Sequence, residues 1–205
     1  SKMEILSGLM RLRQICDTPA LFMEDYHGDS GKLESLLELL EQIQTGSHRV
    51  LIFSQFRGML DIIEKELKKM KMETFKITGS TPAKERQEMT NAFNNGEGDA
   101  FLISLKAGGV GLNLTGADTV ILVDLWWNPA VESQAIGRAH RMGQERNVEV
   151  YRLITRGTIE EKIQELQESK RHLVSTILDG TESRSSLTVA EIREILGIST
   201  ETLEK

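Results

Sequence analysis

The sequence predicts an α/β domain with a mostly parallel central sheet and helices on both of its faces. Short continuous apolar runs, such as RVLIFS at 49–54 and TVILVD at 119–124, are typical of strands buried on both sides. The segments between these runs place apolar residues at helical spacing instead. Alternating strands and helices with short connections predict a parallel sheet, and 205 residues suffice for one such domain with flanking helices.

The elements are expected in a definite order along the chain. Two helices come first, strands and helices then alternate, and two helices close the sequence. The expected strands cover 49–54, 74–78, 100–104, 119–124 and 148–154. The expected helices cover 3–16, 32–44, 59–71, 82–95, 158–178 and 186–198. Because the opening residues already follow a helical pattern, we expect the chain to be part of a longer protein.

The composition fits a globular protein, since 39% of the residues are hydrophobic and 27% are charged. No signal peptide opens the sequence and no run approaches the ~18 apolar residues of a membrane span, so no membrane partner is expected. The single cysteine, Cys16, cannot form an internal disulfide, which favours a reducing compartment. We expect Cys16 to be a small buried hydrophobe, with a reactive thiol as the alternative.

The charge balance gives no sign of a dedicated nucleic-acid binder, because the net charge is −6 and such proteins usually carry excess Lys and Arg. Charge is nevertheless unevenly distributed along the chain. Residues 138–156 contain five arginines against two glutamates. A local basic strip of this kind can hold a phosphate backbone even on an acidic protein.

Polar and glycine residues gather where the expected strands end, at 54–56, 78–80, 104–106 and 124–126. The carboxyl ends of parallel strands lie along one edge of a sheet, and ligands of such folds bind beyond that edge. We therefore expect a functional site there.

Two glycine-containing segments near this edge differ in what they predict. SLKAGGVGLNLTGAD at 104–118 combines glycines, which allow close backbone approach, with apolar residues that predict a packed loop rather than a linker. GDSGK at 28–32 lacks the spacing, the hydroxyl and the preceding strand of a phosphate-binding loop, so we expect only a turn into a helix.

The segment ITGSTPAKER at 77–86 predicts a helix with Pro82 at its first position and Ser80 or Thr81 as its cap. Free amides at such a helix start could hold a phosphate, although ordinary capping explains the pattern equally well. Arg86, one turn further on, could pair with nearby acidic residues.

The segment QAIGRAHRMGQ at 134–144 places Arg138 and Arg141 three residues apart. If the segment is helical, both guanidinium groups share one face and could reach the same anion. For an isolated pair at this spacing, a solvated basic face is the alternative.

Taken together, five segments resemble the second RecA-like lobe of Swi/Snf-type DNA translocases, which belong to the second helicase superfamily. The segments are VLIFSQF, ITGST, SLKAGGVGLNLTGADTVI, DLWWNPAVESQAIGRAHRMGQ and VYRLITRGTIEEKI, in the right order over nearly the whole chain. The ending RMGQ separates the fourth segment from DEAD-box relatives. The resemblance implies a linking helix at 1–30, a three-layer RecA-like lobe at 31–157, a brace-like helix at 158–180 and a helical tail at 181–205.

In this family ATP lies between two lobes, and the first lobe supplies the phosphate loop and the carboxylates that hold Mg²⁺. The resemblance implies that this lobe contributes arginine fingers and other groups near the nucleotide, namely Arg138, Arg141, Gln134, Gly109 and Gly111. It also implies DNA-backbone contacts, tolerant of sequence and sensitive to salt, from Ser54, Gln55, Gly79, Ser80, Ser104 and Lys106. The helix around Glu160 and Lys162 resembles a brace that crosses back to the first lobe.

The implied function is the second motor lobe of an ATP-dependent translocase that moves on double-stranded DNA and remodels DNA-bound proteins, with RNA polymerase as one candidate target. The expected partners are ATP with Mg²⁺, duplex DNA and the first lobe of the same chain. Since half of the ATP site is missing, we expect the fragment alone to hydrolyse no ATP. A non-catalytic helicase-like module for DNA or protein binding is one alternative, and an unrelated α/β nucleotide enzyme with its own phosphate loop is another.

One segment departs from the family pattern. LRQICDTPAL resembles the element L-R-x-x-C-x-H-P, but Asp17 and Thr18 stand where Asn and His are usual, which puts its packing and domain coupling in doubt. No chromatin-reading module is recognised, and this favours a simple bacterial or archaeal member located with the nucleoid in the cytoplasm. A eukaryotic member would be nuclear.

Overall fold

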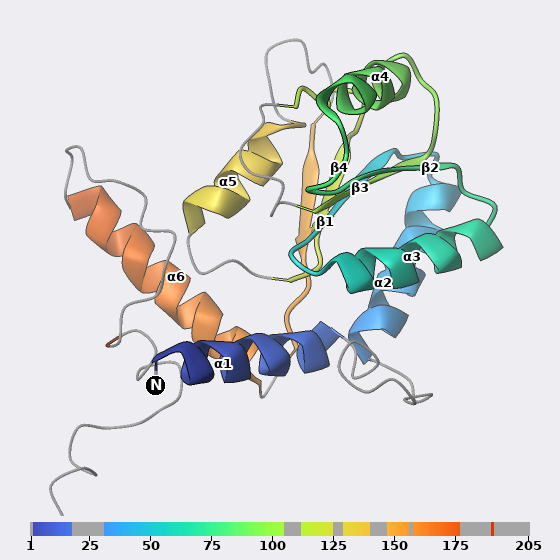
Figure 1. The fold of residues 1–205 in the computed structure, drawn as a ribbon. Coiled ribbons are helices and arrows are strands. Elements are labelled where there is room, and N and C mark those ends of the chain that lie inside the picture. The colour runs from blue at the N-terminus through green and yellow to red at the C-terminus, as the bar shows by residue number, and fades with distance from the viewer. Residues whose placement is uncertain are drawn as a thin grey trace, which may run out of the picture.

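The computed structural model describes residues 2–17, 31–104, 112–124, 129–139, 147–155, 158–176 and 190. These residues form a three-layer α/β domain in which helices cover both faces of a five-stranded sheet (Figure 1). This arrangement confirms the predicted fold class. Among the described helices, none is long and apolar enough to cross a membrane.

The sheet is parallel throughout and has the strand order β2-β3-β1-β4-β5. Its strands are β1 (Val50–Ser54), β2 (Thr74–Ile77), β3 (Ala100–Ser104), β4 (Thr119–Leu122) and β5 (Glu149–Arg152). Every residue of β1, β3 and β4 is buried, which explains why their sequences are continuous apolar runs. All five strands are predicted from the sequence. β3 has the predicted bounds, β1 and β2 are each one residue shorter, and β4 and β5 are shorter by two and three residues.

Six helices surround the sheet in the described part of the chain. They are α1 (Lys2–Asp17), α2 (Gly31–Thr45), α3 (Arg57–Lys69), α4 (Ala83–Asn94), α5 (Pro129–Gly137) and α6 (Ile159–Thr176). Helices α2 and α3 pack on one face, and α4 and α5 pack on the other (Figure 1). The expected helix at 186–198 lies outside the described residues except for Ala190.

The two cores follow from the alternation of side chains along each strand. Val50 and Ile52 of β1 pack against α2 and α3, whereas Leu51 and Phe53 pack against α4 and α5. Burial of each such side chain typically stabilises the fold by about 1.5–3 kcal/mol. Because the two faces share every strand, the positions of the strand ends are fixed from both sides.

Helices α1 and α6 lie beyond the carboxyl ends of the strands rather than on a sheet face (Figure 1). Leu9 of α1 is buried, and the hydroxyl of Thr155, just before α6, donates to the carbonyl oxygen of Cys16 at 3.2 Å. Cys16 itself is only half-buried, so the expectation of a buried side chain is wrong.

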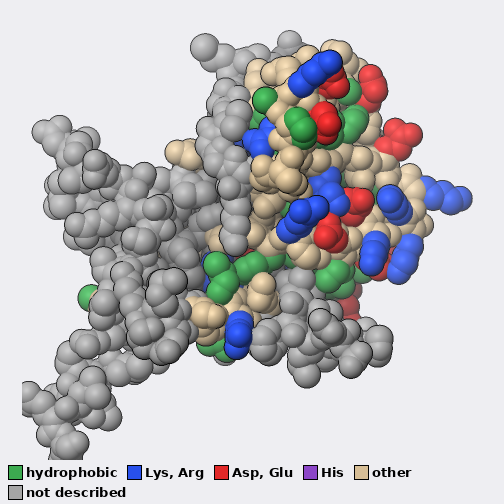
Figure 2. Space-filling view, in the orientation of Figure 1, with side chains coloured by type: hydrophobic (Ala, Val, Ile, Leu, Met, Phe, Trp, Pro, Cys, Tyr) green, Lys and Arg blue, Asp and Glu red, His purple; other side chains and the backbone are tan. Residues whose placement is uncertain are grey.

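The visible surface of the described residues carries no uniformly basic face. Lys and Arg side chains alternate with Asp and Glu side chains over α3 and α4 in the space-filling view (Figure 2). On α3, Lys69 lies 2.7 Å from Glu66, and Lys68 lies 3.7 Å from Glu64. On the face shown in Figure 2, a nucleic-acid interface would therefore rest on local groups and not on a continuous basic surface.

Candidate functional site

A buried hydrogen-bond network around Asp124 joins the carboxyl ends of β1 and β4. The hydroxyl of Ser54 donates to the Asp124 carboxylate, and the backbone N–H of Gln55 donates to Asp124 Oδ1 at 2.9 Å. The N–H of Phe56 donates to Ser54 Oγ at 3.1 Å. Both Ser54 and Asp124 are buried, so the network fixes the turn by which the chain leaves β1 and enters α3.

This network bears on the predicted DNA contacts. Ser54 is 0% exposed and its hydroxyl is engaged with Asp124, so the side chain is inaccessible to a DNA phosphate in this structure. Gln55 is also buried, and its side-chain oxygen accepts a hydrogen bond from Arg13 of α1. Ser104 is buried at the end of β3, in register with Ser54. Lys106 lies outside the described residues.

The loop between β2 and α4 folds back on itself around Arg86. The Arg86 guanidinium donates to the carbonyl oxygens of Thr81 at 2.8 Å, Thr78 at 3.2 Å and Gly79 at 3.3 Å. Gly79 and Ser80 are exposed at the tip of this loop. A cationic side chain thus lies directly beneath the two residues that the sequence predicts to contact a phosphate.

The predicted cap of α4 is wrong. The helix begins at Ala83, after Pro82, and no side chain makes a capping hydrogen bond at its start. Thr81 Oγ1 instead accepts a hydrogen bond from the N–H of Thr78 at 3.0 Å, so its hydroxyl faces back toward β2. The hydroxyls of Thr78 and Ser80 also lie 3.0 Å apart, which rigidifies the loop rather than the helix.

Arg138 follows the end of α5 in a tight turn. The helix stops at Gly137, and the N–H groups of Arg138 and Ala139 donate to the carbonyl oxygens of Ala135 and Ile136, both at 3.2 Å. Arg138 itself therefore lies just outside α5. Arg138 is only 4% exposed, and Arg141 lies outside the described residues.

The turn at Arg138 is joined to the end of the glycine-rich loop. The N–H of Leu114 donates to the carbonyl oxygen of Arg138 at 2.9 Å. Asn94 of α4 holds the same part of the loop, because its side chain donates to the carbonyl oxygen of Asn113 at 2.7 Å and accepts from the N–H of Gly116 at 3.0 Å. This half of the loop is packed as predicted, with Leu112 and Leu114 buried.

Other residues predicted near the nucleotide are placed less fully. Gln134 lies on α5 with its side chain exposed, one turn before Arg138. Gly109 and Gly111 fall outside the described residues. Among the residues that the structure describes, no three His, Cys, Asp or Glu side chains are grouped so that they could hold a metal ion.

A buried ion pair that the sequence does not reveal anchors α6. Lys32 of α2 pairs with Glu160 of α6, and its ammonium also donates to the carbonyl oxygen of Val123 at 2.8 Å. The second oxygen of Glu160 accepts a hydrogen bond from the N–H of Thr155 at 3.2 Å. Burial raises the pKa of Glu160, and the charge of Lys32 offsets this rise only in part.

Of the two residues that mark the predicted brace, only Glu160 makes a contact within the core. Lys162 is exposed and lies 3.4 Å from Glu165 on the same helix. In the sequence, Glu160 is one of two acidic residues in the first turn of α6, a pattern that usually indicates a favourable interaction with the helix dipole.

Comparison with known proteins agrees with this geometry. The family model of the helicase conserved C-terminal domain matches residues 31–143. A Bacillus subtilis protein named as an ATP-dependent helicase/translocase, YwqA, is 44% identical over 201 residues, which cover 95% of this chain and 22% of the relative. The mouse SWI/SNF-related matrix-associated actin-dependent regulator of chromatin subfamily A member 1 is 44% identical over 190 residues, covering 86% of this chain and 18% of that protein.

Solved structures extend the comparison to the fold. The C-terminal domain of the Sulfolobus solfataricus SWI2/SNF2 ATPase has a TM-score of 0.71 and 36% identity, covering 95% of this chain and 82% of that chain. The ATPase core of the same organism in complex with double-stranded DNA has a TM-score of 0.72, and 41% of that chain is covered. The chain spans about a fifth of the two curated relatives, 22% and 18% of their lengths. It therefore belongs to the helicase C-terminal domain family, as the second RecA-like lobe of a Swi/Snf-type ATPase.

Proposed function

We propose that this chain is the second motor lobe of an ATP-dependent translocase on double-stranded DNA. Its family membership supports the proposal, as does its similarity to an archaeal ATPase core solved with double-stranded DNA. One relative is named as a helicase/translocase and another as a regulator of chromatin, which supports the remodelling of DNA-bound proteins as the outcome of movement. The first lobe of the same protein would complete the motor.

The position of Arg138 is the observation that carries the proposal. Its carbonyl oxygen accepts a hydrogen bond from Leu114 in the glycine-rich loop, and its side chain is shielded from bulk water. A cation in such surroundings interacts with a phosphate more strongly than an exposed one. As an arginine finger, Arg138 would stabilise charge on the transferred phosphoryl group, an effect typically worth ~10³–10⁵ in rate.

The remaining nucleotide contacts are part of the same proposal. Arg141 would act beside Arg138, Gln134 would orient near the nucleotide, and Gly109 and Gly111 would let the loop approach it. ATP would be bound with Mg²⁺, held mainly by carboxylates of the first lobe. The contribution of this lobe is therefore positive charge and shape rather than metal coordination.

For DNA, we propose that the exposed loop tip contacts phosphates of the backbone. Gly79 and Ser80 are accessible there, and the Arg86 guanidinium beneath them favours an anion. The buried side chains of Ser54, Gln55 and Ser104 would act indirectly, by holding the loops from which backbone groups and Lys106 reach the DNA. Such contacts predict binding that tolerates sequence and weakens with salt.

The test is DNA-stimulated ATP hydrolysis by the full-length protein. We expect Arg138→Ala and Arg141→Ala to bind ATP and duplex DNA but to lose turnover by about a thousandfold or more. Lys69→Ala is the matched control, because Lys69 is an exposed cation on the far end of α3. If ATP turnover survives both substitutions, this lobe is a binding module that contributes no catalytic arginine. ATP hydrolysis by the isolated fragment would refute the two-lobe site.

A further inference from the structure

Helix α1 lies outside the residues matched by the family model, yet it is docked on the domain through a buried arginine. The family model begins at residue 31, whereas α1 covers Lys2–Asp17. Arg13 of this helix is 1% exposed. An arginine is rarely buried so completely without specific partners, because removing its charge from water is costly.

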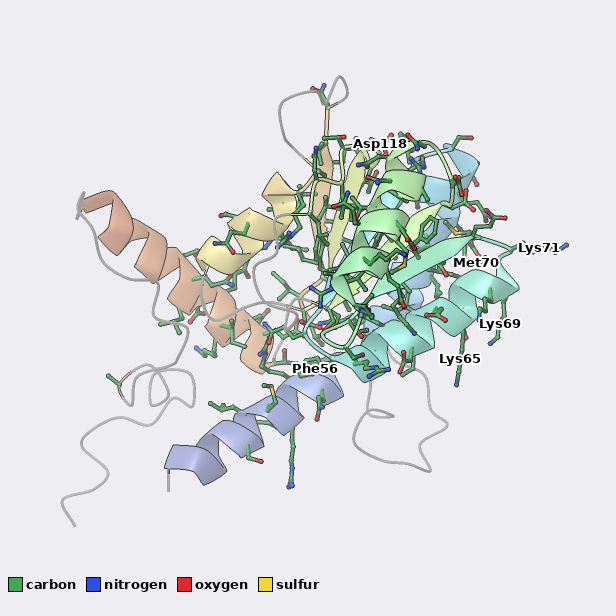
Figure 3. The ribbon with its side chains drawn as sticks, turned by 45° about the horizontal axis from the view of Figure 1, so that its top comes forward. Phe56, Lys65, Lys69, Met70, Lys71 and Asp118 are labelled. Carbon is green, nitrogen blue, oxygen red and sulfur yellow. The ribbon has the colours of Figure 1, made fainter. Side chains whose placement is uncertain are left out.

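Two residues that follow β1 receive Arg13. Its Nη1 donates to Gln55 Oε1 at 2.9 Å, and its guanidinium lies 5.5 Å from the centre of the Phe56 ring. Figure 3 places Phe56 where α1 meets the start of α3. Arginine suits this position because its planar group can donate in plane while its face rests on an aromatic ring.

The same turn is held from the other side by β4. The backbone N–H of Gln55 donates to Asp124, which also accepts from Ser54. Gln55 is thus fixed at its side chain by α1 and at its backbone by the end of β4. If α1 moved away, the buried side-chain oxygen Oε1 of Gln55 would lose its charged donor, which is unfavourable. The position of α1 and the conformation of the turn at 54–57 are therefore linked.

We infer that Arg13 is a positioning residue that couples the docking of α1 to the β1–α3 turn at the DNA-facing edge of the lobe. The inference rests on the proposed function, because it assigns that edge to DNA phosphates. Helix α1 precedes the lobe in the chain. A displacement of the segment that leads into α1 would therefore be transmitted to the turn through Arg13 and Gln55. The affinity of this lobe for DNA thereby depends on the position of α1.

The first measurement is the concentration of duplex DNA that gives half-maximal ATPase stimulation of the full-length protein. We expect Arg13→Met, which keeps the volume of the side chain, to raise this concentration about tenfold, the scale of one charge-assisted hydrogen bond. The KM for ATP and the kcat at saturating DNA should stay within about twofold, a separation that general loss of folding would not produce. Arg11→Met is the control, since Arg11 is exposed on the same helix.

A double substitution tests whether Arg13 acts through Gln55. Gln55→Leu should raise the half-maximal DNA concentration at least as far as Arg13→Met, and the combined variant should equal Gln55→Leu alone. Effects that multiply, or an unchanged DNA concentration in Arg13→Met, would overturn the inference. If Arg13→Met fails to fold, Gln55→Leu carries the test, and an unchanged DNA concentration in that variant overturns it as well.

Hydrogen exchange separates this inference from the proposed function. In the full-length protein, the backbone N–H groups of Gln55 and Phe56 should exchange about tenfold faster in Arg13→Met than in Arg11→Met. This readout needs neither DNA nor ATP. A wild-type protein without DNA stimulation would refute the proposed function alone, whereas unchanged exchange at the turn would refute the role of Arg13.

Discussion

The buried pair of Lys32 and Glu160 should be one of the largest single contributors to the docking of α6. Both side chains are 2% exposed, and Lys32 also satisfies the carbonyl oxygen of Val123. Lys32→Met keeps most of the apolar stem but leaves a carboxylate buried without its cation. Breaking a buried pair in this way costs about 3–5 kcal/mol. We therefore expect the free energy of unfolding to fall by that amount in denaturant titrations followed by far-ultraviolet circular dichroism.

The pH dependence of the free energy of unfolding gives this prediction a second, independent test. Burial raises the pKa of Glu160 and the Lys32 charge lowers it part of the way, so the substitution should raise that pKa further. A carboxyl whose folded pKa is raised contributes stability below its unfolded pKa, and this is lost as the pH rises through the folded pKa. The deficit of Lys32→Met should accordingly be largest near neutral pH and shrink as the pH falls toward about 5.

Two further variants decide what the loss means. Lys69→Met removes an exposed partner of Glu66, with 72% of the lysine side chain in solvent, and should cost at most about 1 kcal/mol. Lys32→Met combined with Glu160→Leu should recover most of the stability, because no charge is then left buried. If Lys32→Met costs no more than Lys69→Met, the reasoning about this pair is refuted.

Two smaller predictions concern Asp118, which directly precedes β4, and two glycines. Burial alone would raise the pKa of Asp118, but hydrogen bonds from His48, Thr119 and the N–H of Arg49 together lower it. Asp118 therefore contributes stability that is present above its unfolded pKa and lost as the pH falls, and Asp118→Asn should flatten the acid side of the stability curve measured by denaturant unfolding. Gly116→Ala should cost about 1–3 kcal/mol in the same assay, because an added Cβ would lie 2.9 Å from the carbonyl oxygen of Phe93. Gly8→Ala, where no atom lies within 4 Å, should be neutral or stabilising; equal effects at the two glycines would contradict this account.

Strand positions could be predicted from the sequence because burial on both faces leaves a continuous apolar run. The segments of β1 and β3 show this directly, and their predicted ends agree with the structure to within one residue. The end of α5 is harder to predict, because the sequence of 134–144 favours a helix beyond Gly137, the residue at which α5 ends. Gly137 is the local signal for that stop, because glycine commonly ends helices.

The contacts that organise the site could not be predicted, since they join residues far apart in the chain. Arg13 meets Gln55 across 42 positions, and Lys32 meets Glu160 across 128. Each of these residues is locally an ordinary charged or polar member of a helix or turn. Only the tertiary fold shows that α1, α2 and α6 contribute side chains to one buried polar layer at the carboxyl ends of β1 and β4. The same layer explains why Ser54, a candidate for DNA contact by resemblance, is buried.

Movement along duplex DNA is the most direct test of the proposed motor. It can be measured as ATP-dependent displacement of a third DNA strand from a triplex by the full-length protein. We expect the wild type and Lys69→Ala to displace the strand, and Arg138→Ala to bind ATP and duplex DNA without displacing it. Displacement that persists in Arg138→Ala, or a wild type that hydrolyses ATP on DNA and never displaces the strand, would contradict the account.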